Sequence, residues 1–196
     1  MVLLVADTSA LVSLGTVAND SLNPLDLLLD SHAVVVPEQV VDELTETASY
    51  DDASGRAAQG VLDRQSSFEV RSVELDETFP LDDGENAAVT LANEIDAVQL
   101  LCDEFNRLAL VHASLAETRL VTTPILLIAL VRNSALSPDT AEGFLAEMSD
   151  ARSWSSNSYV ERSKATLRQQ RDNVLDNTRP ATPTATDNEV EQRERR

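Results

Sequence analysis

Short apolar runs alternate with amphipathic segments over the first 131 residues of the chain. The runs fall at residues 2–6, 32–36, 98–102 and 119–122, and each is too short for a globular helix. Residues 68–73 instead alternate between apolar and polar side chains, which predicts a half-exposed strand. Between these segments, apolar residues recur at helical spacing, and a proline often stands in the first helical turn. Alternating strands and helices predict a parallel sheet covered on both faces. We therefore expect an α/β fold, a three-layer α/β/α sandwich with a central parallel sheet of four to five strands.

The hydrophobic pattern also sets the expected domain boundaries. Helices are predicted at residues 10–17, 24–29, 37–46, 81–92, 105–115, 124–131 and 138–148. These segments and the strands make residues 1–150 one domain. Residues 151–176 are expected to form a polar linker and an exposed helix. Residues 177–196 offer almost nothing to bury, which predicts a disordered charged tail.

Composition narrows the class of protein. The chain has 196 residues and a formal net charge of -19, with Lys164 as its only lysine. Such an excess of carboxylates is typical of proteins from salt-loving organisms, and it would repel nucleic acid unless a cation or an arginine patch intervened. The single cysteine, Cys102, excludes an internal disulfide. We find no signal peptide and no membrane span, so we expect a cytoplasmic protein with no membrane partner.

Two apolar strands end in an acid. Asp7 follows the first strand and Asp103 follows the fourth. Ligands of open α/β sheets bind beyond the carboxyl ends of the strands, where both acids would lie if these strands are neighbours. Thr8 and Ser9 are placed to hold the Asp7 carboxylate and to cap the next helix. The alternative is that Asp7 is only a helix N-cap.

Two further acids lie on predicted helices. Glu43 flanks an apolar stripe on the helix after the second strand, and Glu85 lies in the first turn of the helix before the fourth strand. Helix capping or a halophilic surface would account for Glu85, and Glu43 could be an ordinary solvated helix acid. Four carboxylates that meet without a cation would raise one another's pKa. A bound Mg²⁺ or Mn²⁺ would relieve that repulsion and could activate water on a phosphodiester.

Several stretches around these acids resemble one known family, the PIN-domain nucleases, over residues 1–131. The matching stretches are Asp7-Thr8-Ser9, Val36-Pro37-Glu38, Val41-Asp42-Glu43-Leu44, Leu81-Asp82-Asp83-Gly84-Glu85-Asn86-Ala87-Ala88 and Leu100-Leu101-Cys102-Asp103-Glu104. The Gly84-Glu85 form is similar to the VapC-type toxin branch. The resemblance implies a PIN-like nuclease domain over residues 1–150.

The resemblance also implies roles for particular residues. The catalytic and metal-binding acids would be Asp7, Glu43, Glu85 and Asp103, and the supporting residues would be Thr8, Ser9, Asp83 and Glu104. Because the family often has aspartate where this chain has Glu85, Asp83 is a rival for that position. The polar or basic residues that often follow the fourth acid would be Asn106 and Arg107.

The implied function is a Mg²⁺- or Mn²⁺-dependent endoribonuclease that hydrolyses RNA phosphodiester bonds, as the toxin of a toxin–antitoxin pair. The expected partners are an RNA substrate, an antitoxin protein and a second copy in a homodimer. The alternative is a catalytically inactive PIN-fold module that binds RNA or a protein. A phosphoacceptor receiver domain is disfavoured, because Thr122-Thr123-Pro124 follows the fifth strand where such domains need a lysine.

Overall fold

The computed structural model describes the backbone of residues 1–178 and the side chains as far as residue 173. Its centre is a five-stranded, all-parallel sheet in the order β3-β2-β1-β4-β5. The strands are β1 (Val2–Ala6), β2 (His32–Pro37), β3 (Glu69–Arg71), β4 (Gln99–Leu101) and β5 (Arg119–Val121). The predicted adjacency of the first and fourth strands is confirmed, because Val5 pairs with Leu100 and Ala6 with Leu101.

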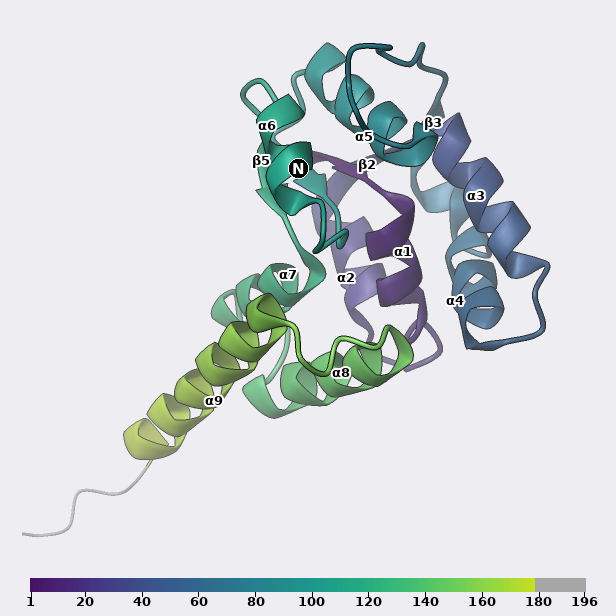
Figure 1. The fold of residues 1–196 in the computed structure, drawn as a ribbon. Coiled ribbons are helices and arrows are strands. Elements are labelled where there is room, and N and C mark those ends of the chain that lie inside the picture. The colour runs from purple at the N-terminus through teal and green to yellow at the C-terminus, as the bar shows by residue number, and fades with distance from the viewer. Residues whose placement is uncertain (179–196) are drawn as a thin grey trace, which may run out of the picture.

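Helices connect the strands and continue beyond the last one (Figure 1). They are α1 (Thr8–Gly15), α2 (Pro24–Ser31), α3 (Glu38–Ala48), α4 (Ala53–Leu62), a 3-10 turn (Gln65–Ser67), α5 (Asp83–Glu94), α6 (Leu108–Ser114), α7 (Thr123–Arg132), α8 (Pro138–Ala151) and α9 (Ser158–Thr178). No helix within residues 1–178 is both long and apolar enough to cross a membrane.

The alternating side chains of β1 build two cores. Leu4 and Ala6 join α1, α2, α3, α4 and α7 on one face, whereas Val5 packs with α5 and α6 on the other. A strand buried on both faces must be apolar at every position, which is why its sequence shows no alternation. The predicted α/β/α sandwich is thereby confirmed.

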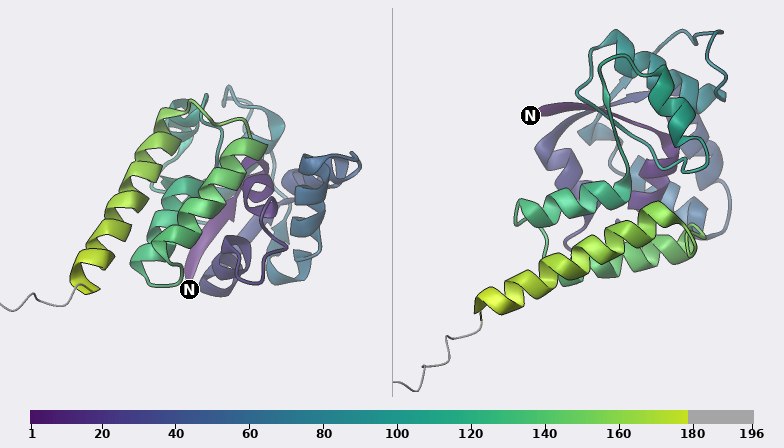
Figure 2. Two further views of the ribbon diagram at one scale, coloured as in Figure 1. Left: turned by 90° about the horizontal axis from the view of Figure 1, so that it is seen from below. Right: turned by 60° about the vertical axis from the view of Figure 1, so that its left-hand side comes forward.

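Helix α9 returns along α8 and α7 (Figure 2). It buries Val160 and Leu167 in the first core. Arg168 and Arg171 also pair with Glu142 of α8, at 2.7 and 3.1 Å. The predicted disordered tail lies outside the described residues from residue 179 onward.

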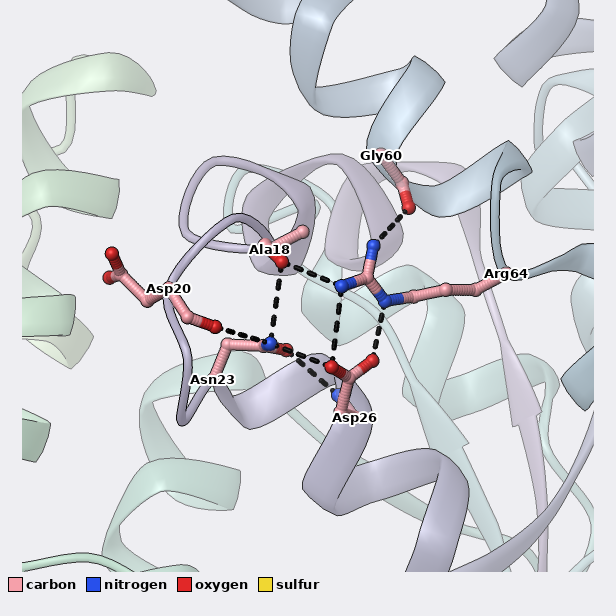
Figure 3. Close-up of polar contacts among 6 residues, drawn as sticks. All are labelled: Ala18, Asp20, Asn23, Asp26, Gly60 and Arg64. Carbon is pink, nitrogen blue, oxygen red and sulfur yellow. Dashed lines mark hydrogen bonds and ion pairs between the residues drawn. The ribbon is translucent and has the colours of Figure 1, made fainter.

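One arginine links α2, α4 and the turn that follows α1 (Figure 3). Arg64, just after α4, donates to the Asp26 carboxylate, to Ala18 O at 2.6 Å and to Gly60 O at 2.8 Å. Asn23 donates to Ala18 O at 3.3 Å and to Asp26 Oδ2 at 2.8 Å. These bonds fix the turn between α1 and α2 against α4.

The helix predicted over residues 105–115 is shorter in the structure and begins only at Leu108. The preceding residues form tight turns instead, because Phe105 N donates to Asp103 O at 2.8 Å and Arg107 N to Glu104 O at 2.9 Å. The chain thereby reverses beside the carboxyl end of β4. Residues 103–107 therefore form a loop at the carboxyl ends of the strands and are not part of a helix.

Candidate active site

Asp7 is the N-cap of α1 at the carboxyl end of β1. Its Oδ2 accepts the Ser9 backbone N–H at 3.2 Å and the Ser9 hydroxyl at 2.5 Å. Asp7 is therefore a helix N-cap, as the alternative held, but capping uses only one of its two carboxylate oxygens. The residue is 3% exposed, and burial, reinforced by the charge of Glu43, raises the pKa of Asp7 to about 6.

Ser9 connects Asp7, through hydrogen bonds, to the residue that follows β4. Its Oγ accepts the Asp103 backbone N–H at 2.9 Å while it donates to Asp7. The Asp103 Oδ1 accepts the Thr123 N–H at 2.7 Å, and its buried Oδ2 has no hydrogen-bond partner among the described residues. Burial raises the pKa of Asp103, and the hydrogen bond from the Thr123 N–H and, to a smaller extent, the charge of Arg152 partly offset that rise.

Glu43 reaches the same region from α3. Thr8 donates its hydroxyl to Glu43 Oε2. A Cβ built on Gly84 would collide with the Glu43 carboxylate, so the glycine backbone allows the carboxylate to lie against the start of α5. Burial raises the pKa of Glu43, and the charges of Asp82, Asp83 and Glu85 raise it further.

Glu85 has a structural role as well. It forms a capping box with Asp82 at the start of α5, and its Oε2 accepts from Arg107 at 2.9 Å. Its buried Oε1 has no partner among the described residues. Burial raises the pKa of Glu85, although Arg107 opposes that rise. Capping therefore explains one oxygen of this carboxylate and leaves the other unsatisfied.

A cavity of about 410 Å³ opens between these elements, and we name it the acidic cavity. Among the acids predicted from the sequence, Asp7, Glu43, Glu85 and Glu104 line it, together with the hydroxyl residues Thr8 and Ser9. Asp103 does not line it but faces an adjoining cavity of about 590 Å³. Glu104 and Arg152 line both cavities. Asp83 is exposed and lines neither.

The carboxylate oxygens in this region are ligands of the kind that a hard divalent cation prefers. In each of Asp7, Glu43, Glu85 and Asp103, one carboxylate oxygen is held by the protein, and the other accepts no hydrogen bond from the described residues. Within that part of the chain, however, no three His, Cys, Asp or Glu side chains are grouped closely enough to hold a metal ion. The acids therefore surround the cavity without forming a finished coordination sphere.

Sequence reasoning missed two residues of this region. Asp82 lines the acidic cavity and is the N-cap of α5. Arg152, at the end of α8, lines both cavities. No local pattern singles out Arg152, because its position depends on how α8 packs back toward the sheet edge.

Comparison with known proteins identifies the fold family. Residues 3–169 match a family model described as PIN domain, so the match extends from β1 into α9. A comparison with curated proteins finds no match. The family match covers most of the chain and agrees with the parallel five-stranded sheet. The chain therefore belongs to the PIN-domain family, whose members are typically nucleases.

Proposed function

We propose that the protein is a Mg²⁺- or Mn²⁺-dependent endoribonuclease. The observation that carries this proposal is the set of four acids, Asp7, Glu43, Glu85 and Asp103, each with one oxygen held and the other free of hydrogen bonds within the described residues. Their raised pKa values show that each carboxylate is less stable ionised here than in water. A cation would compensate that cost.

The residues of the chain would divide the work as follows. Asp7, Glu43 and Glu85 would hold the cation in the acidic cavity, with Asp103 completing the set from the adjoining cavity. Ser9 and Thr8 orient the carboxylates of Asp7 and Glu43. When bound, the cation supplies charge that neutralises a phosphodiester and lowers the pKa of a water molecule.

The test is cleavage of a mixed RNA pool with Mn²⁺ against EDTA, in concentrated KCl. We expect cleavage that requires the cation and is lost in Asp7→Asn, which keeps the size of the side chain but removes its charge. Equal cleavage by Asp7→Asn and the wild type in Mg²⁺ would overturn the proposal. A mixed pool is used because it makes no assumption about the target sequence.

A second candidate is an inactive PIN-fold module that binds RNA or a protein. The ion pair between Arg107 and Glu85 favours it, because a guanidinium already neutralises one of the four acids, and no three acids are grouped for metal binding in the described residues. Calorimetric titration with Mg²⁺ and Mn²⁺ distinguishes the candidates. Saturable binding that is weakened in Glu43→Gln supports the nuclease, whereas no heat of binding supports the module.

The biological setting proposed here is that of a VapC-like toxin from a salt-adapted organism, acting as a homodimer and held by an antitoxin. The Gly84-Glu85 stretch and the net charge of -19 support this setting. A neighbouring short reading frame with a DNA-binding motif is expected beside the gene. Expression of this protein alone should arrest growth, and co-expression of that frame should restore it.

A further inference from the structure

The adjoining cavity differs in chemistry from the acidic cavity. Its volume is about 590 Å³, and its walls come from the loop after β4 and from the connection between α8 and α9. The residues that matter here are Phe105, Arg152, Trp154, Asn157 and Tyr159. We name it the aromatic cavity. Asp103 and Glu104 line it on the side of the acidic cavity, whereas aromatic rings, uncharged polar side chains and Arg152 line the rest and have no part in the proposed hydrolysis.

Three aromatic side chains that line the aromatic cavity form one cluster. Phe105 meets Trp154 edge to face, with ring centroids 5.0 Å apart, and stacks on Tyr159 at 5.9 Å with the rings 20° apart. Trp154 is only 8% exposed, whereas Tyr159 is 49% exposed. Phe105 thus supports one face of the Tyr159 ring, and much of that ring remains available to a planar ligand. Only 4% of the chain is aromatic, so this concentration of rings is unusual within it.

Arg152 lies where the two cavities meet. Its Nε is buried and has no hydrogen-bond partner within the described residues. It forms no ion pair there either, although its charge acts on the nearby carboxylate of Asp103. A guanidinium in this position can donate to phosphate oxygens in its fixed fork geometry. Arg152 can therefore bind an anion, whereas the carboxylates around it would repel one.

We propose that the aromatic cavity is a nucleotide subsite, in which Tyr159 stacks on a base of single-stranded RNA and Arg152 binds the phosphate between the two cavities. This inference rests on the proposed nuclease function and deepens it. A base can stack on a protein ring only when it has left its own helix, so the subsite selects unpaired RNA. Asn157 and the neighbouring serines supply hydrogen bonds to the edges of that base.

Binding can be measured without cleavage, because Trp154 is the only tryptophan and lines the cavity. Hexa-adenylate RNA is titrated into the full chain in EDTA and 1 M KCl. Tryptophan emission and the anisotropy of a labelled copy of the RNA are followed together. We expect saturable changes in both signals, with a stable, GC-rich RNA hairpin binding more weakly. Equal affinity for the hairpin would overturn the selectivity for unpaired RNA.

The variants separate stacking from general surface effects. Tyr159→Ala should weaken binding about tenfold or more, as expected for loss of one base–aromatic stack, whereas Tyr159→Phe should retain affinity. Arg152→Gln should weaken binding comparably. Leu22→Ala, an exposed residue outside both cavities, is the matched control and should bind as the wild type does. Circular dichroism verifies that each variant is folded.

The two proposals fail in different ways. If Tyr159→Ala and Arg152→Gln bind hexa-adenylate and cleave RNA with unchanged KM, the subsite is wrong and the nuclease proposal stands. If the wild type binds RNA as described but never cleaves it with Mn²⁺, the nuclease proposal is wrong and the aromatic cavity is the binding site of an inactive module. An absence of any change in Trp154 emission or anisotropy on adding RNA would overturn the subsite directly.

Discussion

The backbone of Gly84 lies directly against the carboxylate of Glu43, in space that any side chain at position 84 would fill. Alanine is favoured over glycine in a helix by up to about 1 kcal/mol, so Gly84→Ala should not unfold α5. Instead, the flexible Glu43 side chain should move away. We expect RNA cleavage to fall by about tenfold to a hundredfold, because displacement of a group by about 1 Å can cost that much.

Gly143 provides the matched control for this substitution. A Cβ built there meets nothing within 4 Å, and the residue lies in α8. Gly143→Ala should therefore preserve cleavage and slightly raise the melting temperature. Wild-type cleavage by Gly84→Ala would show that the placement of Glu43 is unimportant.

The buried Asp7 predicts a specific dependence of stability on pH. Its pKa is about 6 in the folded protein, against the ordinary aspartate value of 3.8 expected in the unfolded chain. Between these values the folded state holds a proton that the unfolded chain releases, so stability falls as pH rises through this window. Asp7→Asn has no carboxyl group to ionise at this position, so its folded state does not carry the free-energy cost of a buried charge. It should exceed the wild type in free energy of unfolding by about 2 to 3 kcal/mol at pH 7.5, with the difference vanishing below about pH 4.

Urea unfolding in EDTA from pH 4 to pH 8 measures this difference. Adding Mg²⁺ at neutral pH should then stabilise the wild type more than Asp7→Asn, because a ligand stabilises only the state that binds it. Parallel pH profiles for the two proteins would contradict the assigned environment of Asp7.

The Arg64 cluster should matter for stability and not for chemistry. Arg64→Ala removes the donors to Ala18 O and Gly60 O and the ion pair with Asp26. We expect a loss of about 1 to 3 kcal/mol in the free energy of unfolding, since part-buried acceptors lose a charged donor and Asn23 replaces it only in part. Cleavage per folded molecule should be unchanged. Arg56→Ala, on the exposed side of α4, is the control and should leave stability nearly as it was.

The net charge of -19 predicts that salt stabilises the fold. The Debye length falls from about 10 Å at 0.1 M salt to about 3 Å at 1 M, which screens repulsion between surface carboxylates. The melting temperature should therefore rise steadily with KCl over this range. A melting temperature that falls or stays constant would show that carboxylate repulsion does not limit stability.

The sequence was informative wherever the determinant was local. The continuous apolar runs before Asp7 and Asp103 predicted buried parallel strands, and strand pairing brings those two ends together. The first-turn position of Glu85 left helix capping as an alternative to metal binding, and the capping box shows that Glu85 does cap α5. Local pattern could not reveal that Arg107 pairs with Glu85, since the two meet only through the fold. It also could not show that Asp103 faces a different cavity from Asp7, or that Arg152 stands between the two cavities.

Cys102 lies 3.9 Å from the hydroxyl of Ser9 and is 1% exposed. A buried, protonated thiol does not react with alkylating reagents until the structure around it opens. The only cysteine in the chain is therefore a built-in probe of local opening at the ends of β1 and β4. Its rate of alkylation, measured with and without Mn²⁺ or RNA, would report how firmly each ligand closes this edge of the sheet.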